Sequence, residues 1–386
     1  MQYIVMEMKS NKLIGKKIAL LITGSIAAVE CVKLSRELQR HGADITCYMS
    51  KGASEIIHPN TMEFATGKKP ITSLTGALEH LVNFDLILVA PATANTLSKI
   101  AHGIADNPVT ALIAGATCQV ILAPTMHQEM YENPIFQKNL VKLKEEYTVI
   151  EPKMEENAAK MAEIKVIIDE VLSAVSNKDM IGKKVLITAG PTAEPIDAIR
   201  IITNRSSGKM GIALAREAKY RGAVVTLVLG PGPNKPPESV EVIRVESAED
   251  MATAIKMQKS YDIYIGAAAV SDFTTTVHHK KISSRAGSVK IELKPTDKII
   301  STIDKNTLKV GFKAEHNISE DALIKSAKNL AKEHNLDLVV ANDVSKDIFG
   351  SDESEALILM GKNVIKLKRM QKSELAGKIL DALVSL

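Results

Sequence analysis

Residues 185–211 read VLITAGPTAEPIDAIRIITNRSSGKMG, and this stretch decides the fold. Its apolar start, Val185 to Thr188, predicts a buried strand, and Ala189-Gly190-Pro191 predicts a turn directly after it. A long polar loop comes next, and we expect a helix to start near Ser206 or Ser207. Polar loops at the carboxyl ends of strands are where open α/β sheets bind ligands. The stretch therefore predicts an α/β fold with a ligand site at this loop.

The segment Ser206-Ser207-Gly208-Lys209 has the chemistry of a phosphate site. It offers hydroxyl groups, the backbone N–H groups of a helix N-terminus and a cation. The alternative is a serine N-cap followed by an ordinary amphipathic helix from Met210 to Tyr220. The sequence leaves both interpretations open.

The pattern of the second half repeats that of the first half. Four pairs of segments recur in the same order: 14–18 with 181–185, 21–24 with 186–190, 41–46 with 221–226, and 84–90 with 261–267. The strands within them are short continuous apolar runs, which is typical of parallel sheets covered on both faces. We therefore predict two doubly wound, mostly parallel Rossmann-like α/β domains, residues 1–177 and 178–386, joined at the polar segment 176–179.

Periodicity and turn residues predict further elements. The expected strands are 18–22, 45–49, 84–89, 120–123 and 339–342. The expected helices are 27–41, 96–104, 164–175 and 374–386, with another beginning near Asp297. Residues 357–359 and 364–367 predict a hairpin at the sheet edge, and the basic segment 274–293 predicts a long excursion or β-arm.

The composition excludes several classes of protein. The chain has 386 residues, which favours two domains, and a net charge of only +4. It has no Trp, six Phe and seven Tyr, which disfavours a reader of single-stranded nucleic acid. Its three cysteines, Cys31, Cys47 and Cys118, form no CxxC pair. We expect reduced thiols, a cytoplasmic location, no nucleic-acid partner and no membrane span.

Three loops at predicted strand ends of the first half would form one crevice. Thr23-Gly24-Ser25 can approach a ligand closely and cap a helix, the small residues from Ala90 to Asn95 suit a flat ring, and 124–131 forms the third loop. His80 lies before the strand at 84–89, where a structural role competes with a catalytic one.

These segments, together with 103–107, resemble the flavin-containing cysteine decarboxylases, which bind FMN. The resemblance implies that the domain decarboxylates 4′-phosphopantothenoylcysteine to 4′-phosphopantetheine, with His80 as the catalytic base or orienting residue. The implied FMN-binding residues are Gly24, Ser25, Ile26, Ser50, Ala92, Thr93, Ala94 and Asn95.

The first half departs from that family at two places. His127 stands where the family has Asn, and we expect it to bind the substrate carboxylate as a hydrogen-bond donor. The family also has a flap cysteine after this loop, whereas no Cys occurs after Cys118 here. Either another group reprotonates the product, or this half is a degenerate flavin-binding or scaffold domain beside an active ligase. We expect activity to be retained.

Residues 185–211 resemble the opening of phosphopantothenate–cysteine ligase, and the resemblance to both families extends from about residue 14 to 384. It implies that cysteine is joined to 4′-phosphopantothenate through an acyl-cytidylate. Asn204 would hold the acyl carbonyl or oxyanion, Asp272 the base or ribose of CTP, and Lys281 its phosphates. Mg²⁺ would accompany CTP, with no metal ligands assigned. The implied nucleotide-binding residues are Gly266, Ala267, Ala268, Asp272, Lys281, Thr296, Asp297, Lys298, Ile299, Phe312, Lys328 and Lys332.

The whole chain thus resembles the bifunctional coenzyme A biosynthesis proteins, in an archaeal-like variant. The family implies a homo-oligomer with trimeric decarboxylase contacts and dimeric ligase contacts, up to a dodecamer. An alternative NAD(P)-dependent reductase would need G-x-G-x-x-G or Tyr-x-x-x-Lys, and the sequence contains neither.

Overall fold

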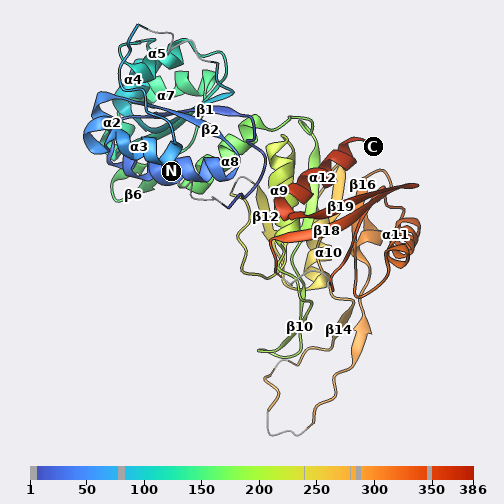
Figure 1. Ribbon diagram of the computed structural model, residues 1–386. Coiled ribbons are helices and arrows are strands. Elements are labelled where there is room, and N and C mark those ends of the chain that lie inside the picture. Colours follow the sequence, from blue (N-terminus) through green and yellow to red (C-terminus); the bar gives the residue numbers. More distant parts are fainter. Residues whose placement is uncertain (1–6, 77–82, 239, 279, 284–287, 346–349) are drawn as a thin grey trace. The chain divides into compact units, whose positions relative to one another are not determined.

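The computed structural model describes residues 7–76, 83–238, 240–278, 280–283, 288–345 and 350–386. The chain divides into two compact units, Met1–Ser176 and Asn177–Leu386 (Figure 1). Each unit is an α/β structure built on a mostly parallel sheet, as predicted. No helix in the described part of the chain has the length and apolar character needed to cross a membrane.

The sheet of unit 1 has the strand order β2-β1-β3-β4, with β5 parallel to β4 and with β7 and β6 extending the end of β4. β1 is parallel to both β2 and β3, which places Ile18 between Ile45 and Leu86. The strands are β1 (Lys17–Ile22), β2 (Asp44–Met49), β3 (Leu86–Thr93), β4 (Gln119–His127), β5 (Thr148–Val149), β6 (Lys153–Glu155) and β7 (Ala158–Lys160).

Helices cover the sheet of unit 1. Leu97 of α4, Leu112 of α5 and Leu140 of α7 pack in one buried cluster with Leu21 of β1, while α8 packs against β3 and β4. The helices are η1 (Ile26–Glu30), α1 (Cys31–Arg40), α2 (Lys51–Ile56), α3 (Pro59–Thr66), α4 (Ala94–Ala101), α5 (Pro108–Ala114), α6 (Gln128–Tyr131), α7 (Pro134–Glu146) and α8 (Ile164–Val175).

Several element boundaries in unit 1 differ from those expected. The helix expected at 27–41 is a 3₁₀ turn, η1, followed by α1. Strand β3 continues to Thr93 and strand β4 to His127, beyond the apolar runs that predict them. The extra residues pair with neighbouring strands, as Thr93 does with Thr125, so partners distant in sequence determine these ends.

Unit 2 has an eight-stranded sheet in the order β12-β11-β8-β13-β16-β17-β18-β19. The first six strands are parallel, and β18 and β19 form the predicted antiparallel hairpin at the edge. The strands are β8 (Lys184–Ala189), β11 (Val224–Leu229), β12 (Glu241–Arg244), β13 (Ile263–Gly266), β16 (Leu308–Glu315), β17 (Leu338–Asp343), β18 (Glu353–Met360) and β19 (Asn363–Gln371).

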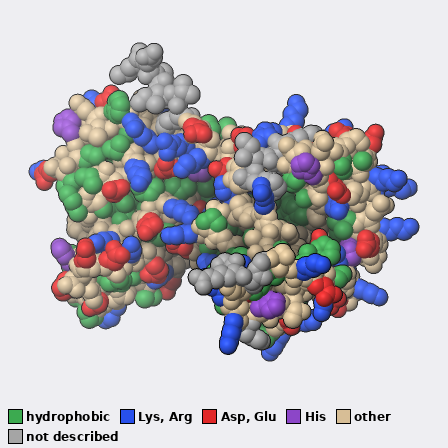
Figure 2. Space-filling view, turned by 90° about the horizontal axis from the view of Figure 1, so that it is seen from below, with side chains coloured by type: hydrophobic (Ala, Val, Ile, Leu, Met, Phe, Trp, Pro, Cys, Tyr) green, Lys and Arg blue, Asp and Glu red, His purple; other side chains and the backbone are tan. Residues whose placement is uncertain are grey.

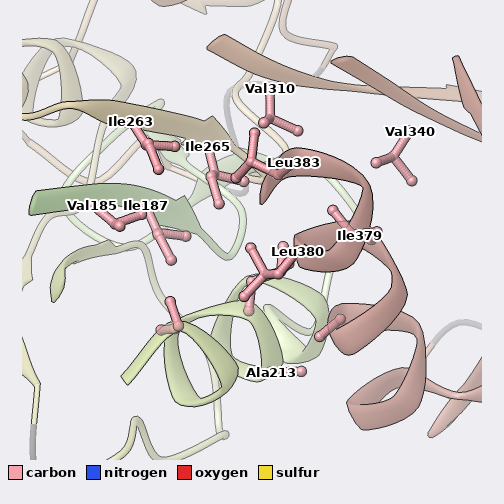
Figure 3. Close-up of a cluster of buried hydrophobic side chains, with 14 of the residues drawn as sticks. Val185, Ile187, Ala213, Ile263, Ile265, Val310, Val340, Ile379, Leu380 and Leu383 are labelled. Atoms are coloured by element: carbon pink, nitrogen blue, oxygen red, sulfur yellow. The ribbon is translucent and has the colours of Figure 1, made fainter. Parts of the chain in front are cut away.

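The two faces of this sheet pack against different helices. Figure 3 shows the face on which Ile187 and Ile265 lie against α9 and α12, with Leu380 and Leu383 of α12 between them. Leu186 packs with α10 on the other face, and Val339 packs with α11. The helices are α9 (Lys209–Tyr220), α10 (Ala248–Met257), η2 (Ile299–Thr302), α11 (Glu320–His334) and α12 (Lys372–Val384).

Two short antiparallel strand pairs extend from the sheet of unit 2 (Figure 1). β9 (Ala193–Pro195) pairs with β10 (Ile201–Thr203). β14 (Phe273–Thr275) pairs with β15 (Leu293–Pro295) at the base of the predicted arm. The polar loop of residues 191–207 therefore contains a β-hairpin rather than irregular chain.

The repeated segments have the same geometry in both units. Asp85 accepts a hydrogen bond from the Lys17 backbone N–H at 2.8 Å, and Asp262 accepts one from the Lys184 N–H at 2.8 Å. Gly42 and Gly222 have φ of 97° and 91°. A Cβ at these glycines would lie 2.6 and 2.8 Å from Ile14 and Ile181, respectively. The repeated Asp residues thus make the same contact at the beginning of the first strand in each unit, and the repeated Gly residues end a helix in the same way.

His41 and Arg221 precede these glycines. In each unit the backbone carbonyl of this residue links the end of a helix to the segment before the first strand by a hydrogen bond. The His41 carbonyl accepts from the Leu13 N–H at 2.8 Å, and the Arg221 carbonyl accepts from the Met180 N–H at 3.1 Å. The Arg221 side chain also donates to Glu217, Asp381 and the Gly377 carbonyl. It therefore links α9 to α12.

We expect Arg221→Met to destabilise unit 2 by about 3 kcal/mol, because it leaves the Glu217 carboxylate buried without its cation. The two side chains are 9% and 8% exposed. The matched control is Arg369→Met, which removes an exposed pair with Glu353 and is expected to cost at most about 1 kcal/mol. Urea denaturation followed by circular dichroism measures both, and equal losses would contradict the buried role.

We expect unit 1 to lose stability as the pH falls below about 6.5, in part through His41. Burial lowers the pKa of His41 below its ordinary value of 6.5, so the unfolded chain binds a proton that the folded chain does not. Protonation therefore favours unfolding. His41→Gln should reduce the fall in melting temperature between pH 7 and pH 5, and an unchanged pH profile would refute this assignment.

Candidate functional site

The strand order of unit 1 reverses between β1 and β3, which is where open α/β sheets form their binding crevice. The loop after β1 begins with Thr23, and the end of β3 carries Ala92 and Thr93. The Thr23 hydroxyl donates to the Pro91 carbonyl at 2.6 Å and accepts from the Thr93 N–H at 3.0 Å. Thr23 is only 1% exposed, so a buried side chain joins the two predicted loops.

Three hydroxyl side chains of this crevice lie at helix N-termini. Ser25 caps η1, Ser50 caps α2 and Thr93 caps α4, and each accepts a backbone N–H. Gly24 and Gly52 pack so closely that a Cβ on Gly24 would lie 3.1 Å from the Gly52 Cα. Glycine is therefore needed where the loop after β1 meets the start of α2.

The predicted cofactor residues of unit 1 are only partly enclosed. Ala92 and Ala94 are buried, whereas Ile26 is 76% exposed. Asn95 lies next to Ala94 in the first turn of α4 and is exposed. His80 lies outside the described residues.

His127 is the last residue of β4 and is exposed. It pairs with Ala158 of β7, and the next backbone N–H, that of Gln128, donates to the Asn157 carbonyl at 3.0 Å. The segment where the resemblance places a flap cysteine is thus a hairpin of β6 and β7 beside His127. Cys31 and Cys47 are buried in the unit, and burial raises the pKa of Cys47 to about 12.

In unit 2 the strand order reverses between β8 and β13. Of the predicted nucleotide residues, Gly266 is the last residue of β13, and Ala267 and Ala268 lie in the loop after it. The Asn204 amide Nδ2 donates to the carbonyls of Ala269 at 3.2 Å and Val270 at 3.0 Å. The structure therefore brings the predicted acyl-binding residue to the predicted nucleotide loop. Since Nδ2 is engaged, Oδ1 is the Asn204 atom that has no partner among the described residues.

Asp272, Thr296 and Lys298 also come together. The Lys298 ammonium is 2.5 Å from the Asp272 carboxylate, and the Thr296 N–H donates to the Asp272 carbonyl at 3.0 Å. Asp297 is exposed between them, and Ile299 is buried at the start of η2. Phe312, half-buried on β16, packs against the core on the α9 side.

Lys281 lies on the arm and is exposed. Its neighbour Ile282 is held by the tip of the β9–β10 hairpin, because the Ile282 N–H donates to Asp197 at 3.0 Å and the Ile282 carbonyl accepts from Arg200 at 3.1 Å. The pKa of Asp197 is held well below its usual range by hydrogen bonds to its carboxylate. The largest contribution comes from the Ile282 N–H, followed by the N–H groups of Ile199 and Arg200 and the Arg200 guanidinium. Asp197 is therefore a carboxylate anchor for the arm.

The serine N-cap and the helix start expected near Ser206 or Ser207 need correction. The α9 helix begins at Lys209, later than expected, and its N-cap is Gly208 with φ of 71°, not a serine. Lys209 is engaged with the Asp352 carboxylate at 2.7 Å and the Gly350 carbonyl at 2.5 Å. Its charge is thus used in binding the segment before β18.

Lys328 and Lys332 of α11 lie elsewhere. They line a pocket of about 510 Å³ with Asn335, Leu336, Asp337 and Leu359, where α11 ends and β17 begins. The pocket therefore lies at the amino end of β17. The crevice forms at the other end of the sheet, where the carboxyl ends of the parallel strands lie.

Basic and acidic side chains are interspersed on the face drawn in Figure 2. This distribution fits the small net charge of +4. In the parts of the chain that the structure describes, no group of three or more His, Cys, Asp or Glu side chains is arranged to hold a metal ion.

Three buried residues join separate segments of the units, and the sequence analysis gave none of them this role. Thr23, Thr192 and Asp197 all make hydrogen bonds to segments far away in sequence. Their common sequence feature is a hydroxyl or carboxylate in the loop directly after the first strand of a domain. Their partners are decided by the strand order.

Two α/β units, each with polar loops at the reversal of its strand order, define a two-domain enzyme of the α/β class. The family described as "Flavoprotein" matches residues 6–176. The family described as "DNA/pantothenate metabolism flavoprotein C-terminal domain" matches residues 180–386.

Relatives match almost the full chain. The "Coenzyme A biosynthesis bifunctional protein CoaBC" of Thermococcus kodakarensis is 47% identical over 392 residues, covering 97% of this chain and 96% of the relative. The protein of the same name from Methanocaldococcus jannaschii is 38% identical over 385 residues, covering 97% and 94%. The chain belongs to this family of bifunctional coenzyme A biosynthesis proteins, and it is a bifunctional enzyme, a decarboxylase and a ligase.

A solved structure is similar to about half of the chain. The crystal structure of the C-terminal domain of a coenzyme A biosynthesis bifunctional protein CoaBC is 34% identical, with a TM-score of 0.46. The match covers 54% of this chain and 97% of that structure.

Proposed function

We propose that unit 2 joins cysteine to 4′-phosphopantothenate with CTP, and that unit 1 decarboxylates the resulting 4′-phosphopantothenoylcysteine to 4′-phosphopantetheine with FMN. The observation that carries the proposal is the position of the two sets of loops. Each set lies at the strand-order reversal of its sheet, and the loops after β8 and β13 are joined by Asn204. The full-length similarity to the bifunctional proteins of T. kodakarensis and M. jannaschii supports it.

The residues of unit 1 fit FMN. Its five parallel strands have the order 2-1-3-4-5, which in flavodoxin-like sheets binds FMN between the first and third strands. The capping hydroxyls of Ser25, Ser50 and Thr93 lie beside helix N-termini, which favour a phosphate. Gly24 is exposed and leaves backbone accessible to a flat ring. When bound, FMN supplies a reversible two-electron acceptor for the substrate thiol.

In this proposal His127 holds the substrate carboxylate through a ring N–H. Its position at the end of β4, paired with β7, fixes the backbone that presents this ring. The β6–β7 hairpin has no cysteine, so the proton that replaces the lost carboxylate comes from a group other than a thiol of that hairpin. The catalytic role of His80 stays a prediction.

Ligation in unit 2 takes two steps. A carboxylate oxygen of 4′-phosphopantothenate attacks the α-phosphorus of CTP, pyrophosphate leaves, and the cysteine amine then displaces CMP from the acyl carbon. Asp272 would bind the base or ribose, and Lys281 with Mg²⁺ would offset the phosphate charge. Lys328 and Lys332, which line the separate pocket at the start of β17, take no part in this proposal.

To hold the acyl carbonyl or oxyanion, as the resemblance implies, Asn204 would have to donate, but its Nδ2 donates to the Ala269 and Val270 carbonyls. In this proposal Asn204 therefore lies beside the acyl carbon, where its Oδ1, which has no partner among the described residues, accepts from the incoming amine.

We also propose a cytoplasmic homo-oligomer, with trimeric contacts through unit 1 and dimeric contacts through unit 2. Light scattering tests this assembly, and a monomer would contradict it.

The purified protein should be yellow and release FMN on denaturation. Thr23→Val removes the buried hydroxyl that joins the two loops, and we expect about tenfold weaker FMN retention, roughly the effect of one hydrogen bond. The control is Thr226→Val, which removes a hydroxyl of β11 that donates to Glu241. This variant should retain FMN. A colourless wild-type protein would support a degenerate first unit instead.

Mass spectrometry of the products from 4′-phosphopantothenate, cysteine, Mg²⁺ and each nucleoside triphosphate tests the ligase. We expect 4′-phosphopantothenoylcysteine with CTP, and 4′-phosphopantetheine with carbon dioxide when FMN is bound. Asn204→Ala should accumulate the acyl-cytidylate, because the second step loses its acceptor and the loop its clamp. Product formed with ATP and not with CTP would refute the nucleotide assignment.

A further inference from the structure

Thr192 occupies a central place at the reversal of strand order in unit 2. It is 0% exposed. Its N–H donates to the Ala269 carbonyl at 3.3 Å, and its hydroxyl oxygen accepts from the Ser271 N–H at 2.9 Å. Its carbonyl accepts from the Thr203 hydroxyl at 2.7 Å. One residue thus contacts both the β9–β10 hairpin and the loop after β13.

Both of its outer partners adjoin residues of the proposed ligase site. Ser271 directly precedes Asp272, and Thr203 directly precedes Asn204. Asn204 itself donates back to the carbonyls of Ala269 and Val270. The hydrogen bonds therefore form a closed ring that runs from Thr192 through both segments and returns to it.

The ring fixes the spacing of two side chains that would otherwise lie on separate flexible segments. Asn204 and Asp272 are both exposed, so packing does not hold them. The Ser271 hydroxyl adds a bond to the Phe273 carbonyl at 2.6 Å, and the Thr296 hydroxyl one to the Ser271 carbonyl at 2.6 Å. The backbone around Asp272 is thus anchored on the side facing Thr192.

We propose that Thr192 is a positioning residue of the ligase, which sets the separation of Asn204 and Asp272 and so aligns the acyl group with the nucleotide. The inference rests on the proposed function of unit 2. The two bonds have different effects: the hydroxyl acts on the nucleotide side through Ser271, and the carbonyl acts on the acyl side through Thr203. A misplacement of about 1 Å at a reacting group can cost about 100-fold in rate.

The test compares Thr192→Val, Thr192→Ser and Thr203→Val in the full-length protein. Thr192→Val keeps the shape and loses the bond to Ser271, so we expect KM for CTP to rise about tenfold or more, in line with the loss of one hydrogen bond. Thr192→Ser keeps the hydroxyl and should restore KM. Thr203→Val should leave KM for CTP unchanged and slow the cysteine-dependent step, so that acyl-cytidylate accumulates.

Thr226→Val is the matched control, since it removes a hydroxyl from β11 outside the ring, and its kinetics should equal those of wild type. Wild-type KM for CTP in Thr192→Val, or a Thr192→Ser variant no better than Thr192→Val, would overturn the proposal. Should Thr192→Val fail to fold, the exposed Thr203→Val decides, and an unchanged cysteine-dependent step in it would overturn the proposal. A wild-type enzyme that forms no product with any nucleotide would refute the proposed function instead.

Discussion

A buried threonine hydroxyl crosses the reversal of strand order in each unit, and both crevices depend on it. In unit 1 the hydroxyl of Thr23, after β1, accepts from the Thr93 N–H at the end of β3. In unit 2 the hydroxyl of Thr192, after β8, accepts from the Ser271 N–H beyond β13. At a reversal the helices leave toward opposite faces, which opens the crevice between the two loops. In unit 2 the parallel bridge between Pro191 and Ala269 also joins the loops, and in both units a buried side-chain hydrogen bond adds to the connection.

The first strands of the two sheets begin with the same contact, but the segments that follow these strands differ. Asp85 and Asp262 bind the first residues of β1 and β8 in the same way. In unit 1 the chain enters η1 almost at once, whereas in unit 2 the β9–β10 hairpin intervenes before α9. This insertion brings Asn204 to the loop after β13 and Asp197 to the arm. The common design therefore supports two different sites because of one inserted hairpin.

Several charged side chains of unit 2 hold loops in place. Lys209 binds the segment before β18, Arg200 and Asp197 hold Ile282, and Lys298 pairs with Asp272. A cation that is already paired attracts a phosphate less strongly than a free one. Pairing therefore distinguishes the lysines available to a ligand from those that shape the crevice, a distinction that residue type alone does not make.

Apolar runs and Gly-Pro turns are local features, so the amino-acid sequence was enough to predict the two α/β units, their parallel strands and the positions of the crevice loops. The loop expected at Ala92–Asn95 was wrong, because β3 continues to Thr93 and α4 begins at Ala94. Only the tertiary structure decided that Lys209 is engaged with Asp352 and that Lys328 and Lys332 line a separate pocket. It also decided the partners of Thr23 and Thr192. These features depend on strand order and on hydrogen bonds between distant segments, which no local pattern encodes.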